Sequence, residues 1–344
     1  MNNKTVYLGM SGGVDSSVSA LFLKQQGYKV IGVYMKNWSK DLPGMKCPWA
    51  EDLADAKRVA VKLDLDFEVW DFEEAYKQKV GDYMLEEFKK GNTPNPDIMC
   101  NQEIKFKMFY DEAMKRGGNY IATGHYAQVE HGETPKLLRA VDENKDQTYF
   151  LYRISNEALD HTLYPIGHMK KPEVKKLAEE NGFHNAYKKE SMGVCFVGAV
   201  GIQDFLKEYI NIKPGEIREA ETDKVLGMHE GAVFYTIGQR HGLYISGGLP
   251  YYVVKKDLEK NIVYVSKNLN NEDLWTKELK LTDIIWRGEK TEDILVRLRH
   301  RAPLIKAKFK NDTVIFENEI KRPAAGQSVV FYNEIECLGG GIIK

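Results

Sequence analysis

Short apolar runs alternate with amphipathic stretches over the first 130 residues of the chain. The apolar runs predict buried strands at 5–10, 29–35, 67–72 and 119–129. The amphipathic stretches have the spacing of helices at 18–27, 51–65, 73–90 and 103–116, with a loop at 93–102. Strands and helices that alternate in this way build βαβ units. The first part of the chain therefore predicts an α/β fold, with a parallel sheet covered by helices on both faces.

The pattern changes after about residue 205. Helical spacing fades, and strand-like alternation follows at 231–238, 251–256 and 261–267. From about residue 276 strand-like segments dominate, at 294–301, 304–310, 312–318 and 327–333. Their spacing is typical of a small antiparallel barrel or sandwich. The pattern therefore divides the chain at about 1–205, 206–275 and 276–344, with a parallel sheet in the first part and a small antiparallel barrel or sandwich in the last.

The composition is that of a soluble globular protein, because 43% of the 344 residues are apolar and 29% are charged. No apolar run reaches the ~18 residues that a membrane span needs, and the N-terminus has no signal-peptide pattern. Only four residues are cysteines, and no CxxC pair is present. The sequence therefore predicts a protein of the reducing cytoplasm, whose cysteines work as thiols or in transient disulfides.

The net charge of −1 argues, taken alone, against a nucleic-acid partner. One segment departs from that balance, since 287–310 holds eight basic and three acidic residues, a net charge of +5. Alternation along a strand would place Arg297, Arg299 and Arg301 on one face. Such a face is either simply solvated or a contact for phosphates, and in the second case binding weakens steeply with added salt.

The strongest local motif is GMSGGVDSS, from Gly9 to Ser17, which follows a predicted strand and opens a predicted helix. Backbone N–H groups at a helix N-terminus bind anions, and glycines let phosphate oxygens approach the main chain. Ser11 and Ser16 add hydroxyl donors, and Asp15 is a candidate ligand for a phosphate-bound Mg²⁺. The motif lacks the lysine of a Walker A loop and the spacing of a dinucleotide-binding loop. The alternative interpretation is a plain strand-to-helix turn.

Two of the four cysteines lie in loops that precede helical or apolar stretches. Cys100 belongs to NTPNPDIMCNQ and Cys195 to ESMGVCFVG. A thiol near a helix N-terminus has a lowered pKa and therefore more thiolate, whereas Cys47 and Cys337 are interpreted as small buried hydrophobes. Asp97 lies three residues before Cys100 in a loop stiffened by prolines, which is how a reactive group is held in place.

The histidines do not have the spacing of metal ligands. His125, His229 and His241 are isolated, and no HxxxH or HExxH pattern is present. We interpret them as packing or hydrogen-bonding residues. His125 is the candidate for a functional role among them, because its segment TGHYA adjoins the predicted nucleotide site.

The motif SGGVDS resembles the pyrophosphate-binding loop of the ATP pyrophosphatase superfamily, whose members cleave ATP between the α and β phosphates and adenylate a substrate oxygen. Over nearly its whole length the chain is also similar to the bacterial tRNA-uridine 2-sulfurtransferases, or tRNA 2-thiouridylases. Seven segments carry this resemblance in order: GMSGGVDSSV (9–18), VYMKNW (33–38), NTPNPDIMCNQEIKF (92–106), ATGHYA (122–127), KDQTYFL (145–151), GVCFVG (193–198) and YTIGQRHGL (235–243). The resemblance implies an ATP pyrophosphatase domain, a small central domain and a C-terminal β-barrel.

The resemblance also implies roles for individual residues. ATP would be bound by Gly9, Met10, Ser11, Gly12, Gly13, Val14, Asp15, Ser16, Met35 and Gly124. Transfer RNA would be contacted by Asn95, Pro96, Asp97, Lys145, Asp146, Gln147, Arg299 and His300. Cys100 would be the nucleophile, Cys195 would carry sulfur as a persulfide, and Asp97 would transfer a proton at the target base. The two cysteines would form a transient disulfide.

The implied activity is ATP-dependent 2-thiolation of the wobble uridine, U34. Mg²⁺ would come with the nucleotide, with no metal site intrinsic to the protein. Expected partners are the glutamine, lysine and glutamate tRNAs and a sulfur-donor protein, and the expected state is a monomer. The chain departs from the family pattern at 190–193, Ala199 and His300. Two rivals remain: another ATP pyrophosphatase, such as an amide-forming ligase, and a nucleotide-gated RNA-binding module.

Overall fold

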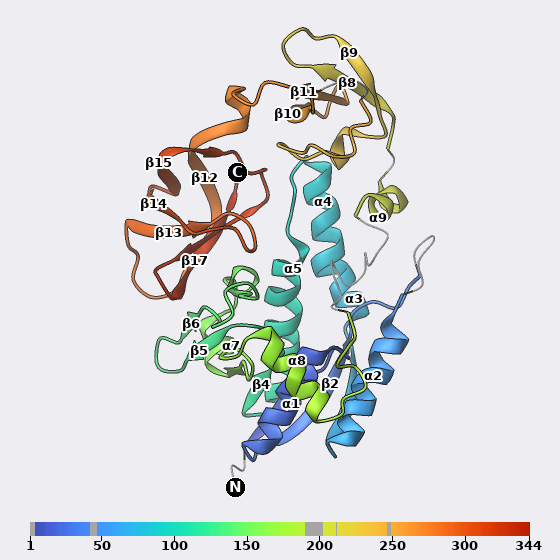
Figure 1. Cartoon of the computed structure of the whole chain (residues 1–344), viewed down its shortest axis with the longest axis vertical. Coiled ribbons are helices and arrows are strands. Elements are labelled where there is room, and N and C mark those ends of the chain that lie inside the picture. Colours follow the sequence, from blue (N-terminus) through green and yellow to red (C-terminus); the bar gives the residue numbers. More distant parts are fainter. Residues whose placement is uncertain (1–3, 42–46, 190–201, 211, 246–248) are drawn as a thin grey trace.

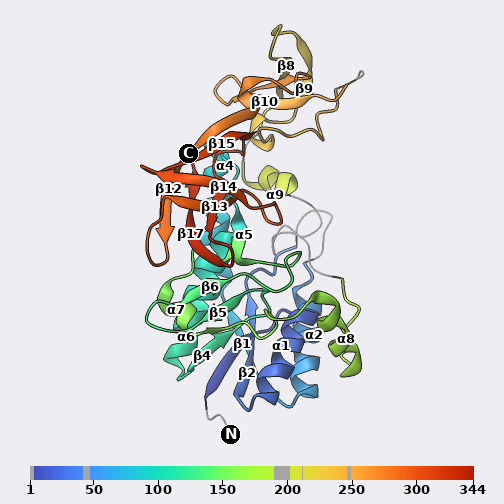
Figure 2. The same cartoon turned by 60° about the vertical axis from the view of Figure 1, so that its left-hand side comes forward.

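The computed structural model describes residues 4–41, 47–189, 202–210, 212–245 and 249–344. The molecule is elongated, with the parallel-sheet domain and the N-terminus at one end and the central domain at the other (Figure 1). The C-terminal barrel lies between these ends, beside the helical segments that connect them (Figures 1 and 2). Within the described ranges, no helix is both long enough and apolar enough to cross a membrane.

A five-stranded parallel sheet forms the centre of the first domain. Its strands lie in the order β3 (Asp66–Asp71), β2 (Lys29–Lys36), β1 (Thr5–Gly9), β4 (Tyr120–Ala122) and β7 (Thr162–Leu163). Every neighbouring pair is parallel, which confirms the predicted sheet. The strand predicted at 119–129 is wrong in extent. The chain leaves the sheet after Ala122, and β5 (Gln128–Glu130) pairs in a different sheet.

Helices cover both faces of this sheet, as alternation along its strands requires. Val6 and Leu8 belong to a core layer on one face, and Tyr7 between them belongs to the layer on the other. The helices of the first layer are α1 (Val14–Gln25), α2 (Trp49–Lys62) and α8 (Lys171–Glu180). The second layer is built by the helical residues between 73 and 115.

Two helical segments make up that second layer and extend toward the central domain (Figure 1). The first consists of α3 (Glu73–Tyr76), the π-helix η1 (Lys77–Asp82) and α4 (Tyr83–Lys89). The second consists of α5 (Pro96–Met99), the π-helix η2 (Cys100–Met108) and α6 (Phe109–Lys115). The loop predicted at 93–102 is therefore wrong beyond Asn95. The side chain of Asn95 accepts hydrogen bonds from the N–H groups of Asp97 and Ile98, at 3.2 and 3.4 Å, and starts a helix there.

The described part of the central domain contains one α-helix, a short 3₁₀ helix and a four-stranded sheet. The α-helix is α9 (Ile202–Tyr209), and the strand order is β10 (Tyr252–Asp257), β11 (Ile262–Ser266), β8 (Gly215–Glu219) and β9 (Val225–His229). The strand predicted at 231–238 is wrong, because Ala232–Phe234 form a 3₁₀ helix, η4. Both Phe234 and its neighbour Tyr235 are buried, a pattern that a strand with alternating faces does not produce.

The C-terminal domain is a closed antiparallel β-barrel. A 3₁₀ turn, η5 (Glu272–Leu274), leads into it. Its strands lie in the order β12 (Trp275–Trp286), β15 (Thr313–Lys321), β14 (Ile305–Lys310), β13 (Asp293–Arg297), β16 (Ser328–Tyr332) and β17 (Glu336–Ile343). Pairing of β12 with β17 closes the barrel. The interior is apolar, with Leu281, Val296 and Phe331 among its buried residues. The predicted α/β class and C-terminal barrel are thus confirmed.

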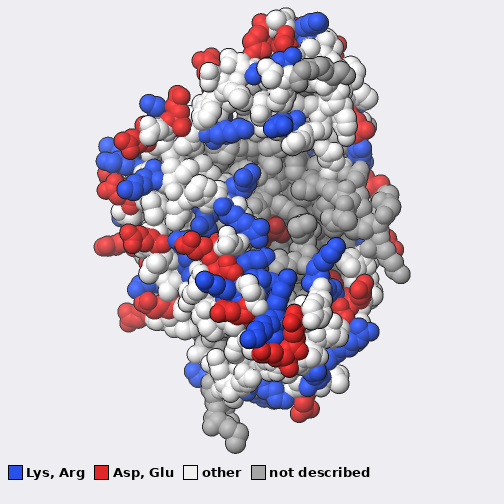
Figure 3. Space-filling view, viewed as in Figure 1, with Lys and Arg blue, Asp and Glu red and all other residues white. Residues whose placement is uncertain are grey.

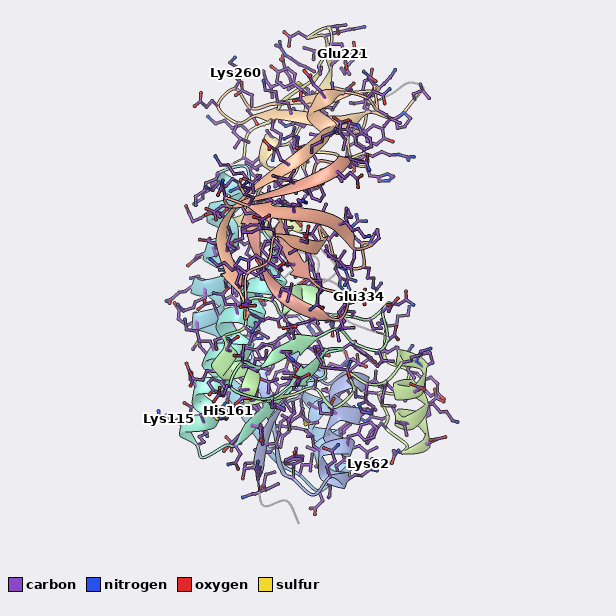
Figure 4. All side chains as sticks on the ribbon, turned by 90° about the vertical axis from the view of Figure 1, so that its left-hand side faces the viewer. Lys62, Lys115, His161, Glu221, Lys260 and Glu334 are labelled. Atoms are coloured by element: carbon purple, nitrogen blue, oxygen red, sulfur yellow. The ribbon has the colours of Figure 1, made fainter. Side chains whose placement is uncertain are left out.

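The first domain reaches into the barrel sheet. Strand β6 (Lys136–Leu138) pairs with β17, and β5 pairs with β6, so two strands of the first domain extend the last barrel strand. Figure 4 shows Glu334, at the turn before β17, on the side of the barrel that faces the first domain. Arg139 of the first domain donates a hydrogen bond to the carbonyl oxygen of Glu334 at 3.1 Å. The short elements η3 (Thr148–Phe150) and α7 (Asn156–Asp160) follow on the same side.

Candidate active site

A cavity of about 430 Å³ lies where strands β1, β2 and β4 end. The chain connects β1 to β2 on one side and reaches β4 on the other, so this is the switch point at which open parallel sheets bind ligands. The cavity gathers nine of the ten residues predicted to bind ATP: Gly9, Met10, Ser11, Gly13, Val14, Asp15, Ser16, Met35 and Gly124. Gly12 is the tenth and does not line it.

The N-terminus of α1 faces this cavity. Gly13 is the N-cap residue, and no side chain of the described residues caps the first turn. The hydroxyls of Ser16 and Ser17 each donate a hydrogen bond to the carbonyl of Gly13 at 3.0 Å, which tightens the loop. The first-turn N–H groups and the positive end of the helix dipole are therefore left for an anion in the cavity.

Two glycines allow the backbone to pack closely around the loop. Gly12 has a φ of +75°, and a Cβ atom there would lie 2.3 Å from the carbonyl oxygen of Asp52 in α2. A Cβ atom on Gly124 would lie 2.7 Å from the backbone nitrogen of Ser16. Larger residues at either position would force the loop, α2 or the end of β4 to move.

The wall beyond β2 is apolar. Tyr34, Met35, Trp38 and Trp49 line it, and the hydroxyl of Tyr34 donates a hydrogen bond to the carbonyl of Trp49 at 3.1 Å. Aromatic and thioether side chains of this kind fit the flat faces of a heterocyclic base. The cavity thus has an anion-binding end at the loop and an apolar end beyond Met35.

The carboxylate of Asp15 is already occupied within the protein. Lys171 donates to both of its oxygens at 2.7 and 2.8 Å, and the hydroxyl of Tyr126 donates at 3.0 Å. Among the residues that the structure describes, no group of three or more acidic, His or Cys side chains is placed to hold a metal ion. The prediction that Asp15 holds a phosphate-bound Mg²⁺ therefore stays a prediction, and the ion pair with Lys171 would have to rearrange for it.

A second ion pair anchors the chain to α2 beside the loop. The ammonium of Lys188 lies 2.7 Å from Asp52 and 2.6 Å from Asp55. Burial disfavours the charged form of Lys188, but its hydrogen bonds to Asp52 and Asp55 outweigh that effect and raise its pKa. Nearby, Asn185 donates hydrogen bonds to the carbonyl of Gly12 at 2.8 Å and to Ser17 at 3.0 Å. These contacts fix the loop from behind.

Two further lysines, Lys105 and Lys189, line the cavity. Within the described part of the chain, neither makes an ion pair, whereas Asp15 and Asp52 are both neutralised by lysines. The balance of charge in the cavity is therefore positive, as a polyphosphate ligand requires.

Asp97 and Cys100 lie on the helical segment beside this cavity. Cys100 is 3% exposed and is the fifth residue of a segment that begins at Pro96. Burial raises the pKa of Asp97, and the positive charge of Lys105 only partly offsets the rise. Cys195 lies outside the described residues, as do the departures from the family pattern at 190–193 and Ala199. The meeting of the two cysteines therefore stays a prediction.

His125 lines the cavity next to Gly124. Its Nδ1 lies 2.8 Å from the hydroxyl of Thr123. Burial lowers the pKa of His125 well below its usual range, and the charge of Lys105 acts in the same direction. The imidazole is therefore neutral at physiological pH. The sequence indicated its place in the nucleotide site only through the neighbouring residues of TGHYA.

The residues predicted to contact tRNA have different environments. Asp146 is 1% exposed and pairs with Arg297 of the barrel at 2.7 Å, and also with Arg139 at 3.4 Å. The side chain of Gln147 accepts a hydrogen bond from the N–H of Tyr126 at 2.9 Å and lines the nucleotide cavity. The carboxylate of Asp146 is thus part of a domain junction and is not presented at the surface.

Other predicted tRNA contacts lie closer to the surface. Asn95 caps α5, Pro96 is buried behind it, and Lys145 is half-buried. Arg299 is exposed, and the ring of His300 packs on Phe150 with centroids 4.6 Å apart. Burial lowers the pKa of His300 to about 4, so it is a neutral ring at physiological pH. Figure 3 shows basic side chains gathered along the middle of one face of the molecule, between the central domain and the foot of the first domain.

The predicted row of arginines on one strand face is wrong. Strand β13 ends at Arg297, so Arg299 and Arg301 follow in a turn. Arg297 points inward to Asp146, and Arg287 is buried with hydrogen bonds to the carbonyl of Tyr152 at 3.1 Å. Two of the eight basic residues of 287–310 therefore make buried contacts that stabilise the fold. The other six are exposed and still outnumber the three acidic residues.

Several residues of the site were not predicted from the sequence. Lys171, Tyr126, Lys188 and Asn185 support the loop through partners more than 100 residues away in the chain. No local pattern identifies such pairs. Cys47 and Cys337 are buried, in line with their predicted role.

Three family models match consecutive parts of the chain. They are described as a tRNA methyl transferase HUP domain (residues 4–199), a tRNA methyl transferase PRC-barrel domain (203–267) and an aminomethyltransferase beta-barrel domain (276–343). Together they cover nearly all of the chain. Full-length relatives are more specific than these domain descriptions.

A protein of Levilactobacillus brevis named tRNA-specific 2-thiouridylase MnmA is 46% identical over 99% of this chain and 96% of its own length. Proteins of the same name from Lactiplantibacillus plantarum and Bacillus velezensis are 45% and 44% identical over 99% and 98% of the chain, and over 96% and 94% of their own lengths. The chain belongs to the tRNA-specific 2-thiouridylase family. Because the 2-thiouridylase relatives match from end to end, the similarity includes the cavity, the helical segment with Cys100 and the barrel.

Proposed function

We propose that this protein catalyses the ATP-dependent 2-thiolation of the wobble uridine, U34, in tRNA. The observation that carries the proposal is the near full-length similarity to tRNA-specific 2-thiouridylases. The geometry supports it, because a positively charged cavity with an uncapped helix N-terminus lies beside the helical segment of Asp97 and Cys100. An amide-forming ligase would need a different nucleophile pocket and no paired cysteines.

ATP would lie in the cavity with its phosphates on the loop between β1 and α1. The N–H groups of the first turn of α1 and the hydroxyl of Ser11 would hold the phosphate oxygens, while the hydroxyl of Ser16, predicted as a further donor, already donates to the carbonyl of Gly13. The adenosine would lie toward Met35 and Gly124. Mg²⁺ carried by the phosphates would neutralise part of their charge, beside Asp15.

The first chemical step would activate the C2 oxygen of uridine. That oxygen is a poor leaving group until it is adenylated. It would attack the α-phosphorus of ATP, and pyrophosphate would depart. The product is an O2-adenylated uridine, from which AMP can leave. The protein's part is to hold the oxygen in line with the phosphorus and to stabilise the charge that develops.

The second step would deliver sulfur. A persulfide on Cys195, loaded by a sulfur-donor protein, attacks C2 through its terminal sulfur. The thiolate of Cys100 then attacks the inner sulfur and breaks the S–S bond. AMP leaves with the former uridine oxygen, and a Cys100–Cys195 disulfide remains for reduction by a cellular thiol. In the alternative, Cys100 releases hydrosulfide first, which then attacks C2.

Asp97 would move the proton at the target base. The raised pKa of Asp97 brings its protonated form closer to neutral pH than that of an ordinary aspartic acid. Its place one helical turn before Cys100 puts the proton carrier and the nucleophile on one rigid element. The base would be a flipped-out anticodon nucleotide, whose single-stranded context lowers the cost of leaving the stack.

The remaining partners follow from the same proposal. Exposed basic residues such as Arg299 and the half-buried Lys145 would contact phosphates of the glutamine, lysine and glutamate tRNAs. His300 would offer a neutral ring at this surface. We propose a monomer in the cytoplasm that receives sulfur from a cysteine desulfurase or a relay protein.

The test is nucleoside mass spectrometry of tRNA from cells with and without the gene. Loss of 2-thiouridine on deletion, restored by the wild-type gene and not by Cys100→Ser, is the expected result. Cys337→Ala is the matched control, since Cys337 is buried in the barrel away from the cavity and should restore thiolation. Unchanged 2-thiouridine in the deletion strain would refute the proposal.

A further inference from the structure

Lys105 is a charged residue of the site that the steps above leave without a role. Its side chain lines the cavity that contains the loop between β1 and α1. Its backbone belongs to η2, on the same helical segment as Asp97 and Cys100. Lys105 therefore connects the side of the site where the phosphates would lie with the side where the target base would lie.

The π-helix determines where Lys105 points. η2 begins at Cys100, and hydrogen bonds in a π-helix join residues five apart. Lys105 thus lies about one turn beyond Cys100 on the same side of the segment, and Asp97 lies about one turn before it. The three functional groups follow one another along one side of a single rigid element.

No carboxylate compensates the charge of Lys105 among the described residues. Glu103, the acidic residue nearest to it in the sequence, is already paired with Lys107 at 3.2 Å and with Lys79 at 3.9 Å. Lys105 is half-buried on this helical segment, whereas the other unpaired lysine of the cavity, Lys189, is exposed. A half-buried charge on a rigid helix needs little reorganisation when a reaction places negative charge beside it.

The electrostatic influence of Lys105 reaches groups on both sides of the site. Its charge lowers the pKa of Asp97 against the opposing effect of burial. The same charge lowers the pKa of His125, which borders the loop. A substrate group held between these two residues therefore lies within the field of the ammonium.

We propose that the ammonium of Lys105 faces the α-phosphate of ATP and stabilises the negative charge that develops there during adenylation, more strongly than it stabilises bound ATP. The proposal rests on the function proposed above. In this step the uridine oxygen forms a bond to the α-phosphorus, and the bond from that phosphorus to the oxygen bridging to the β-phosphate breaks. Pyrophosphate leaves with the electron pair. The charge on the α-phosphate oxygens and on the departing oxygen then faces a fixed cation.

The test compares Lys105→Gln and Lys105→Arg with a matched control, Lys107→Gln. Lys107 lies on the same helix but is exposed, pairs with Glu103 and does not line the cavity. The measurements are single-turnover, tRNA-dependent pyrophosphate release and the equilibrium dissociation constant for ATP. The second measurement also reports whether the site has kept its shape.

Lys105→Gln should slow pyrophosphate release by about 100-fold or more, while the dissociation constant for ATP changes by no more than about threefold. Lys105→Arg should retain part of the rate, and Lys107→Gln should match the wild type. Release by Lys105→Gln within about threefold of the wild type, or a loss explained entirely by weaker ATP binding, would overturn the proposal. A wild-type protein that releases no pyrophosphate with tRNA would instead contradict the proposed function.

Discussion

The nucleotide cavity and the region predicted to contact tRNA are both marked by contiguous motifs, yet they fold very differently. Seven of the eight residues from 9 to 16 line one cavity. In contrast, the consecutive residues 145–147 have three different environments. Lys145 is half-buried, Asp146 is buried against the barrel, and Gln147 lines the nucleotide cavity. The first motif works through its backbone. The second consists of side chains, and that of Asp146 is paired with Arg297 from a distant part of the chain.

The difference lies in what determines each geometry. The loop geometry follows from a strand end, a helix start and glycines, all within about a dozen residues. The environment of Asp146 depends on Arg297, which is 151 residues further along the chain. Local motifs therefore locate a cavity-lining loop well, whereas a charged side chain can bind a partner only if folding has not already paired it.

Gly12→Ala should have the largest effect on ATP binding, because it changes the backbone geometry of the loop. The new Cβ would lie 2.3 Å from the carbonyl oxygen of Asp52, at a φ of +75° that alanine disfavours. We expect ATP affinity to fall on the order of 100-fold or more, measured by equilibrium binding. Gly81→Ala, where a Cβ meets nothing within 4 Å, is the control. Unchanged ATP binding in Gly12→Ala would show that the backbone geometry does not determine the site.

Asp146→Asn should destabilise the fold by about 3–5 kcal/mol, because it leaves the buried Arg297 without its counter-charge. Chemical unfolding measures this. Glu143→Gln is the matched control, since Glu143 also pairs with Arg139 but is 77% exposed, and its loss should cost less than about 1 kcal/mol. If Asp146→Asn kept full stability and only weakened tRNA binding, the contrast between the two motifs would fail.

Lys256 offers a pH-dependent test of how the central domain is joined to the segment that precedes Asn95. Its ammonium donates a hydrogen bond to the carbonyl of Gly91 at 2.8 Å, and burial lowers its pKa to about 8. The folded state therefore binds this proton more weakly than the unfolded state does. Stability is reduced below pH 8 and recovers as the pH rises through that value toward the unfolded pKa.

The comparison is between the wild type and Lys256→Met. The stability of the wild type relative to this variant should rise by about 2 kcal/mol between roughly pH 7 and pH 9.5, by chemical unfolding at each pH. Lys255→Met is the control, because Lys255 is exposed in the same strand. Parallel pH profiles for the wild type and Lys256→Met would contradict the prediction.

The smallest expected effect concerns the exposed basic residues of the barrel. Lys306, Lys308 and Lys310 are exposed along β14, and among the described residues they form no ion pairs. Changing all three to Gln should weaken tRNA binding modestly. It should also flatten the plot of log affinity against log salt concentration by up to about 0.9 per lost phosphate contact. An unchanged slope would show that these lysines do not contact tRNA phosphates.

Patterns that depend on near neighbours were predicted well. Alternation and apolar spacing predicted β1, β2, β3 and the helices that cover them. The strand-like segments from about residue 276 onward indicated the barrel. The motif SGGVDS lines the cavity at the end of the sheet, as its local backbone geometry requires, and the anion that it would bind stays a prediction. The helix start at Asn95 was missed, although an Asn followed by Pro at the first helical position is a recognisable start signal.

Features that depend on distant partners were not predictable. The segment 231–238 has apolar residues that suit a strand, but Phe234 and Tyr235 both pack into the core. The predicted strand through Arg297, Arg299 and Arg301 is wrong after Arg297, because the pairing of that arginine with Asp146 is a tertiary contact. The π-helix that carries Cys100 and Lys105 likewise has no sequence signature of its own.

The most direct test of the account is a reconstitution with purified protein, unmodified tRNA, ATP, Mg²⁺ and a cysteine desulfurase with cysteine as the sulfur source. Pyrophosphate and 2-thiouridine would be measured in the same reaction. We expect one of each per turnover, and we expect Cys195→Ser to release pyrophosphate but to form no 2-thiouridine. Formation of 2-thiouridine without pyrophosphate release, or wild-type thiolation by Cys195→Ser, would contradict this expectation.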